Sequence, residues 1–390
     1  MPSEEELYQE RLVKLHRLRD RGIDPYPARY ARSHTAAEAI AAFEASEQNG
    51  GESPRVSVGG RVTALRTMGK AAFLDLRDGS GRIQVLVRRD AADEASFETL
   101  RDTDLGDIVG ATGPLFRTRT GEITVEAATL TMLSKALQTP PEKWHGLTDT
   151  EQRYRQRYRD LIAIQESRDT FVLRAKVVSA MRRYLDSHGF IEVETPVLTE
   201  HWGGAAARPF VTHHNTLERE LYLRIALELY LKRLIVGGYD KVYEIGRIFR
   251  NEGLSWKHSP EYTMLESYEA YADYGSVMSM VEEMVAYIAE ESIGGLRAPF
   301  GDTEIDFTPP RTRQTLRQSL IEYAGFDPEA YPDLESLSLR MIEMKLTPEP
   351  GAGWGKLLDQ VFSEFVEPKL IQPTFITDHP VELSPLAKRK

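Results

Sequence analysis

Hydrophobic and polar residues alternate in short segments between residues 56 and 134. A period of two is typical of half-buried strands, and turn-forming residues separate the segments. The five segments read VSVGGRVTAL, AFLDLR, RIQVLV, DIVGATGPLF and EITVEAATLTML, with a helix-prone stretch at 91–101. Five short strands within about 80 residues predict a small closed barrel of the OB type.

The second and third of these segments predict one hairpin in detail. Asp78-Gly79-Ser80-Gly81 is a turn signal. Pairing outward from the turn places apolar residues opposite one another on the core face, as Leu76 with Ile83 and Leu74 with Val85. The other face then carries Phe73, Asp75 and Arg77 beside Arg82, Gln84 and Leu86. An outward Phe among Arg and Gln fits stacking on a base of single-stranded RNA; the alternative is a Phe covered by another domain.

The chain outside the barrel predicts an α+β organisation. Residues 4–21 form a helix that ends at Gly22, and residues 44–54 and 135–150 are expected linkers. Another helix begins near Ser167. Its apolar positions over 168–188 are Phe171, Val172, Val178, Met181 and Leu185. Helices mixed with antiparallel strands follow.

Residues 189–271 hold the most informative pattern. A strand at 190–196 stops at Pro196, a helix covers 221–236, and two alternating segments, 241–250 and 262–271, predict an antiparallel hairpin with a long polar loop. If Arg250 lies opposite Tyr262, one surface carries Glu244, Gly246, Ile248, Arg250, Tyr262, Met264, Glu266 and Tyr268. That surface fits a ligand with anionic, cationic and aromatic parts; the alternative is a structural ion-pair network on a partly buried sheet.

Composition and charge narrow the class of protein. The 390 residues carry a net charge of −11 and no cysteine, which excludes disulfides, thiolate zinc sites and a cysteine nucleophile. The charge is uneven, because residues 54–89 have an excess of six positive charges and 271–308 an excess of seven negative charges. A basic module on an acidic body fits nucleic-acid binding at one place; a solvated sheet face is the alternative. The acidic N-terminus and the lack of long apolar runs predict a cytoplasmic protein without a membrane span.

Longer motifs then indicate a family. Residues 249–252 (FRNE) with 258–262 (HSPEY) resemble motif 2 of class II aminoacyl-tRNA synthetases, and 188–198 (HGFIEVETPVL) resembles motif 1 with Pro196 as its marker. Residues 201–215, 243–253 and 69–84 are similar to lysyl-tRNA synthetases in particular. The resemblance runs from about residue 5 to residue 390 and implies four regions. These are a helical extension at 1–53, an OB-fold anticodon-binding domain at 54–135, a linker at 136–166 and a class II catalytic domain, an antiparallel sheet flanked by helices, at 167–390.

The resemblance also assigns roles in ATP binding and catalysis. Arg250 would contact the α-phosphate and the lysine carboxylate, and Glu252 would read adenine or the terminal adenosine of the tRNA. His258 would touch the outer phosphates. Tyr262 stands where the family usually has Phe and would stack on adenine.

Further roles concern lysine and tRNA. Glu228 would hold the α-ammonium group of lysine beside the Gly204 backbone, while Glu266 and Tyr268 would line the pocket of the ε-ammonium group. The residues expected to meet the anticodon are Phe73, Gln84, Glu122 and Arg61.

One part of the family pattern does not occur in the sequence. The family continues with magnesium-binding carboxylates and a Gly-rich motif 3, and no such pattern is found up to Lys390. We therefore expect the catalytic domain to be incomplete, and the metal ligands and part of the active site to lie beyond Lys390.

The resemblance as a whole implies a lysine–tRNA ligase. It would use ATP and Mg²⁺, act on L-lysine and tRNA(Lys), pair as a homodimer through the motif 1 region, and bind no DNA. The alternatives are a non-catalytic tRNA-binding or regulatory fragment or relative, and an aspartyl or asparaginyl member of the same subgroup.

Overall fold

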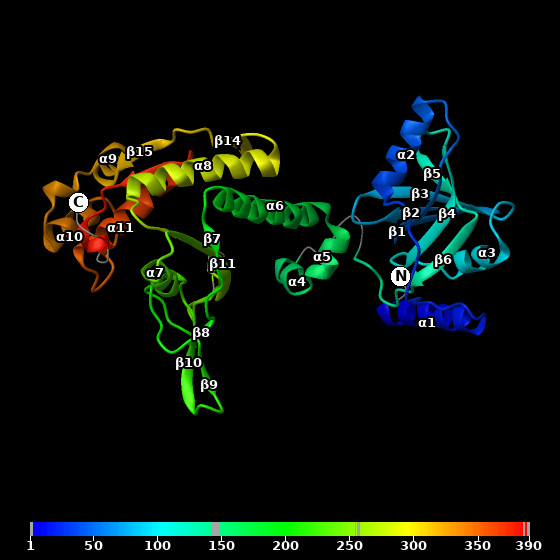
Figure 1. Cartoon of the computed structure of the whole chain (residues 1–390), viewed down its shortest axis with the longest axis horizontal. Helices are drawn as coiled ribbons and strands as arrows, with labels where there is room; N and C mark the ends of the chain where they lie inside the picture. The colour runs from blue at the N-terminus through cyan, green and yellow to red at the C-terminus, as the bar shows by residue number, and fades with distance from the viewer. Residues whose placement is uncertain (1–2, 142–148, 254, 256–257, 385–386, 388–390) are drawn as a thin grey trace. The chain divides into compact units, whose positions relative to one another are not determined.

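The computed structural model describes residues 3–141, 149–253, 255, 258–384 and 387. The chain forms two compact units, Met1–Arg168 and Asp169–Lys390, each of which is described by itself (Figure 1). The expected linker at 135–150 and the loop after Arg250 lie partly outside the described residues, at 142–148 and at 254 and 256–257.

The first unit is built around a closed barrel. Its strands are β1 (Arg55–Met68), β2 (Ala71–Arg77), β3 (Arg82–Arg88), β4 (Ile108–Arg117), β5 (Ile123–Glu126) and β6 (Thr129–Ser134). The order β1-β2-β3-β5-β4 closes because β4 also pairs with β1, and β6 adds to β4. The prediction of an OB-type barrel is confirmed.

The last predicted strand proves to be two strands. The chain crosses β4 closely between β5 and β6, where a Cβ on Gly113 would lie 1.8 Å from the carbonyl oxygen of Glu126. Only glycine permits this approach. The apolar positions change from odd numbers (Ile123, Val125) to even numbers (Leu130, Met132) across the break, and this change of phase is the sequence signal that separates the two strands.

Three helices pack beside the barrel strands. They are α1 (Glu4–Asp20), α2 (Ala36–Gln48) and α3 (Glu94–Arg101), and side chains of Ser3, Thr35 and Asp93 cap their first turns. Leu18 of α1 and Phe43 of α2 belong to the same buried core as the strands. The linker expected at 44–54 therefore begins only after Gln48, because α2 continues to cover the barrel.

The segment expected as a linker at 136–166 contains two helices, α4 (Thr150–Arg155) and α5 (Arg157–Ala163). The fully buried carboxylate of Asp160 accepts hydrogen bonds from Arg153 at 2.7 Å and from Arg157 at 2.5 Å. This charge-assisted pairing joins the two helices. The Pro, Gly and polar residues that predicted a linker give no sign of this ion pair.

The second unit contains a sheet in the order β12-β11-β7, formed by Glu261–Glu269, Lys241–Phe249 and Ile191–Glu192. Helices α6 (Gln165–Ser187) and α8 (Tyr274–Ile293) lie side by side (Figure 1), and the hydroxyl of Tyr184 donates to the carbonyl of Met280. Tyr184 of α6, Tyr243 of β11 and Met284 of α8 form a core where these two helices cover one face of the sheet. On the other face Leu231 of α7 (Glu228–Val236) packs with Val242 and Ile248.

The register of β11 and β12 decides which side chains share a face. Glu244 lies opposite Glu266 and Ile248 lies opposite Tyr262. The pairing of Arg250 with Tyr262 is therefore wrong by two residues, and the Arg250 N–H instead donates to the Pro260 carbonyl at 2.8 Å. A shift of two residues keeps every side chain on its face, so the predicted common surface is confirmed.

The prediction of one helix over 221–236 is wrong in its first half. Arg219–Leu223 is a strand, β10, which lies between β8 (Leu198–Thr199) and β9 (Val211–His214). Pairing with two strands outweighs the local helical periodicity of this stretch. The strand expected at 190–196 is also shorter, because only Ile191–Glu192 pairs with β11.

A second core organises the remaining residues of this unit. Strands β13 (Arg297–Phe300) and β14 (Thr303–Asp306) form a hairpin, and β15 (Thr312–Thr315) runs parallel to β16 (Thr374–Thr377). Helices α9 (Leu316–Ser319), α10 (Leu334–Glu343) and α11 (Trp354–Phe365) surround this core. Among the described residues, no helix has the length and apolar character needed to cross a membrane.

Candidate functional site

The face of β11 and β12 that meets α7 carries the predicted ligand-binding residues. Arg250 follows the last residue of β11 and is half-buried, and its Nε lies 3.5 Å from the carbonyl oxygen of Ile225. Its guanidinium lies 5.6 Å from the ring centroid of Tyr262, within cation–π range. The structure thus brings a cation and an aromatic ring together at the open end of the hairpin.

Glu266 stands in the middle of this face and is already bonded twice. One of its oxygens accepts from the Leu227 N–H at 3.1 Å, and the other accepts from the Tyr268 hydroxyl at 3.1 Å. Because Leu227 precedes the first residue of α7, Glu266 supplies the helix with the cap that its own sequence lacks. Burial raises the pKa of Tyr268 far above its ordinary value, and the charges of Glu266 and Glu228 raise it further. Tyr268 therefore stays protonated and donates to Glu266.

Glu228 is the first residue of α7 and lies beside Gly204. Gly204 has a φ of +83°, and a Cβ on it would lie 3.0 Å from the Glu228 Cβ. The carboxylate of Glu228 is 2.5 Å from Nζ of Lys232, whose side chain is 58% exposed. An exposed pair of this kind contributes little free energy. A ligand ammonium group can therefore replace Lys232 on Glu228.

Glu252 lines a cavity of about 680 Å³ next to Arg250. Its other lining residues are Trp202, Ala206, Ala207, Arg208, Asn251 and Gly253. The Asn251 N–H donates to the Arg208 carbonyl at 2.8 Å and closes this part of the wall. His258 is exposed, and its ring hydrogen-bonds to the Ser255 hydroxyl at 2.7 Å within the loop.

A buried ion pair that the sequence did not reveal lies under the same face. Nη1 of Arg224 donates to Glu244 at 2.6 Å, both side chains are 5% exposed, and the Thr195 hydroxyl donates to the second oxygen of Glu244 at 2.6 Å. Glu244, predicted as part of the ligand surface, is therefore held by protein groups. Of the predicted ligand-binding carboxylates, Glu228 and Glu266 are left without a buried cation as partner among the described residues.

Glycine at position 246 makes room for this pair. A Cβ there would lie 2.3 Å from Nη2 of Arg224 and 2.9 Å from Glu244. A glycine inside an alternating strand is the one sequence signal that something approaches the backbone closely. Arg224 itself gave no signal, because it lies in the stretch predicted as helix.

In the barrel, the predicted hairpin register is confirmed, but the face that carries Phe73 is only partly outward, because Asp75, Gln84 and Leu86 on it are buried. Phe73 lies opposite Leu86 on β3 and opposite Arg66 on β1, and it is half-buried. Gln84 is buried and accepts from the Thr124 hydroxyl at 3.0 Å. The amide of Gln84 is thus oriented by β5.

An ion-pair network borders Phe73 and Gln84. Arg82 joins Asp75 at 3.0 Å to Glu122 at 2.6 Å, and Arg66 lies 3.7 Å from the other oxygen of Asp75. The structure therefore places Glu122 with Phe73 and Gln84. It confirms the predicted place of Arg82 beside them and adds Arg66 from β1, which the sequence did not place on this face.

Comparison with known proteins is consistent with this arrangement. A family model described as tRNA synthetases class II (D, K and N) matches residues 149–390, and one described as an OB-fold nucleic acid binding domain matches residues 56–133. A lysine–tRNA ligase from a strain of Dehalococcoides mccartyi is 55% identical over 388 residues, covering 99% of this chain and 78% of its own length.

The chain belongs to the lysine–tRNA ligase family. Lysine–tRNA ligases from Moorella thermoacetica and Bacillus cytotoxicus are 50% and 47% identical, and the matches cover 100% and 99% of this chain and 79% of each relative. The match to an OB-fold model and to a class II model in this order confirms the predicted architecture of a lysine–tRNA ligase.

Arg61 lies apart from the other predicted anticodon residues of this lysine–tRNA ligase family member. Its Nη1 donates to the Gly106 carbonyl at 2.6 Å. It lines a pocket of about 330 Å³ together with Pro140, Tyr158 and Arg159. The guanidinium is thus directed toward the segment that follows the barrel, and its contact with RNA has no support from this geometry.

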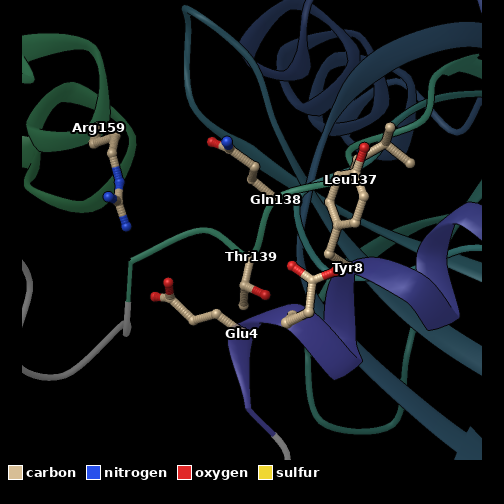
Figure 2. A pocket seen from close by; sticks show the side chains of 7 residues that line it. Glu4, Tyr8, Leu137, Gln138, Thr139 and Arg159 are labelled. Atoms are coloured by element: carbon tan, nitrogen blue, oxygen red, sulfur yellow. The ribbon is translucent and has the colours of Figure 1, made fainter.

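A further pocket of about 240 Å³ in the first unit contains none of the predicted site residues (Figure 2). It lies between the start of α1 and the segment after β6, and Figure 2 shows Glu4, Tyr8, Gln138 and Arg159 around it. Its mixed charges do not define a ligand, and we assign it no role in the lysine–tRNA ligase reaction.

The described residues were also compared with what a metal site requires. Within the described part of the chain, no group of three or more His, Asp or Glu side chains is placed to hold a metal ion. The described residues therefore do not fit the Mg²⁺ that the family implies.

Proposed function

We propose that this protein is a lysine–tRNA ligase that activates L-lysine with ATP and transfers the lysyl group to tRNA(Lys). The observation that carries the proposal is the charge arrangement on the α7 face, where Glu228 and Glu266 lie near Arg250. Lysine has two ammonium groups and one carboxylate, and this set of charges complements it. Aspartate would bring a second carboxylate toward Glu266.

Each of these residues takes one part of lysine. Glu228, beside the Gly204 backbone, holds the α-ammonium group, while Glu266 and Tyr268 hold the ε-ammonium group. The Tyr268 hydroxyl donates a hydrogen bond to one oxygen of Glu266, and this bond orients the carboxylate. Arg250 binds the lysine carboxylate and so brings it to the α-phosphate of ATP.

The chemical step is catalysed by position and charge. A carboxylate oxygen of lysine attacks the α-phosphorus, the bond to the bridging oxygen breaks, and pyrophosphate leaves with its electron pair. Negative charge on the α-phosphoryl oxygens is met by the fork of the Arg250 guanidinium. No protein group becomes covalently linked.

The remaining ATP contacts are proposed for the loop side of the site. Tyr262 stacks on adenine, Glu252 reads adenine or the terminal adenosine of the tRNA, and His258 touches the outer phosphates. The cavity lined by Glu252 supports the second of these assignments. Mg²⁺ would accompany ATP, as the family implies, without ligands among the described residues of this chain.

Recognition of tRNA is proposed for the barrel. Phe73 stacks on an anticodon base, and Gln84 reads a base edge, with Glu122 beside them; Arg61, which is directed toward the segment after the barrel, is not included in this proposal. The partner is tRNA(Lys) and no DNA is bound. Because aminoacyl-tRNA is consumed by ribosomes, we propose a cytoplasmic location.

The identity of the amino acid is tested by ATP–pyrophosphate exchange with the purified protein. Lysine should support faster exchange than each other amino acid, because two carboxylates meet two ammonium groups. Equal or faster exchange with aspartate or asparagine would overturn the proposal. Binding of tRNA(Lys) without any exchange would favour the non-catalytic alternative.

Phe73→Ala should weaken tRNA(Lys) binding by about 1–3 kcal/mol, the value of one lost base–aromatic stack. Lysine-dependent exchange should be unchanged, because the barrel takes no part in it. Fluorescence anisotropy measures the affinity. Leu105→Ala removes another exposed apolar side chain of the first unit and serves as the control. Unchanged affinity in Phe73→Ala would contradict the role of this ring.

Arg250→Lys should lower the exchange rate by about 10²–10³-fold, the scale of one lost charge-stabilising donor. A lysine ammonium cannot make the two-pronged contact of a guanidinium. The matched control is Arg247→Lys, on the other face of the same strand, whose exposed side chain pairs with Glu261 at 3.3 Å. Near-normal exchange by Arg250→Lys would exclude the proposed role.

The protein should be a homodimer that pairs through the region around α6 and β8. Phe171, Val172 and Leu198 are 45%, 57% and 49% exposed, and apolar surface of this kind favours a symmetric partner. Light scattering should give twice the mass of the chain, and Val172→Asp should lower it to one chain. A single-chain mass for the unmodified protein at micromolar concentration would exclude the dimer.

A further inference from the structure

Arg224 is buried at the junction between β10 and α7 and joins three segments of the second unit. Its guanidinium binds Glu244 at 2.6 Å, the Thr195 carbonyl at 3.0 Å and the Arg247 carbonyl at 2.8 Å. Its own backbone N–H donates to Val197 at 2.9 Å, and its carbonyl accepts from Phe249 at 2.9 Å. The side chain and backbone of Arg224 thus tie residues 195–197, the junction and β11 together.

We infer that Arg224 is a positioning residue for lysine activation, an inference that rests on the proposed function. It fixes the junction 224–228 against β11 so that Glu228 and Arg250 face the same substrate molecule. Arg224 touches neither lysine nor ATP in this arrangement. It acts through the groups that do.

The residues next to Arg224 carry the connection to the site. The carbonyl of Ile225 lies 3.5 Å from Nε of Arg250, and the Leu227 N–H donates to Glu266 at 3.1 Å. Glu228 follows directly. A shift of this five-residue junction therefore moves the acceptor of Arg250, the donor to Glu266 and the carboxylate of Glu228 together. Misplacement of a substrate by about 1 Å is enough to cost about 100-fold in rate.

Arg224 also sets the charge of the surface. Glu244 lies directly opposite Glu266 in the register of β11 and β12. Without Arg224, Glu244 would be an uncompensated buried carboxylate on the face that holds Glu266, which is strongly unfavourable. With Arg224 present, the negative charge available to a ligand comes from Glu228 and Glu266.

The test compares steady-state ATP–pyrophosphate exchange of the full-length protein and its Arg224→Lys variant. Lysine at position 224 keeps one charge near Glu244 but cannot also reach the Arg247 and Thr195 carbonyls in one planar fork. We expect kcat to fall by about 10–100-fold and the KM for lysine to rise by about tenfold. The KM for ATP should change less than twofold, because adenine and the outer phosphates are proposed to bind Tyr262, Glu252 and His258, which lie outside the junction.

Gly246→Ala tests the same connection with Arg224 intact. Its Cβ would occupy the place of Nη2 of Arg224, so the same shift of kcat and lysine KM is expected. The loss of kcat in the double variant should be no larger than the loss in the more impaired single variant, because both changes break the same connection. The matched control is Arg219→Lys, also on β10, whose half-exposed side chain pairs with Glu200 at 2.7 Å; its kcat and KM should stay within twofold.

The outcomes separate the inference from the function on which it rests. Exchange by the unmodified protein without preference for lysine overturns the proposed function. Lysine-specific exchange with normal kinetics in Arg224→Lys overturns the inference alone. The inference is also overturned if kcat falls only in proportion to the folded fraction measured by circular dichroism and both KM values stay unchanged. If Arg224→Lys does not fold, normal kinetics in Gly246→Ala overturn the inference.

Discussion

The alternation of side chains along the β11–β12 hairpin determines which residues of the second unit lie on each face of its sheet. In β11 and β12 the even-numbered residues face α7 and the odd-numbered residues face α6 and α8. Tyr243 is thereby fixed in a core, and Glu266 is fixed on the face that meets α7. A slip of one residue would exchange the two faces, burying the carboxylates and exposing the core. Tyr243 and Leu265 on the odd face and Val242 and Ile248 on the even face pack in two cores and hold this register. The position of the even-face carboxylates depends on it.

Three carboxylates lie on the even face and at the start of α7, and the structure neutralises one of them with an internal cation. Glu244, Glu266 and Glu228 lie near one another, and Arg224 neutralises the first of them. A buried pair of this kind contributes little net stability compared with apolar packing, but it is costly to break. Because Arg224 neutralises Glu244, only Glu228 and Glu266 remain available to the proposed lysine substrate.

Local patterns predicted those parts of the fold in which neighbouring residues decide the structure. The register of β2 and β3 follows from the turn at Asp78-Gly79-Ser80-Gly81, and the common face of β11 and β12 follows from strict alternation. Tertiary pairing decided the rest. Arg219–Leu223 became a strand because β8 and β9 lie on both sides of it, and Arg153 and Arg157 join two helices through a buried Asp160.

The same distinction applies to the site. The ligand-facing residues could be named from motifs, because each lies in a contiguous segment with a recognisable pattern. Arg224 could not, since its partners at 195, 244 and 247 come from two other segments of the chain. Gly246 is visible in the sequence as a glycine inside a strand, because a side chain there would collide with Arg224. Arg224 has no such signal, because it lies in a stretch predicted as helix. A glycine that interrupts a strand facing a ligand therefore points to a buried side chain behind the site, and that side chain is found only when the strand's neighbours are known.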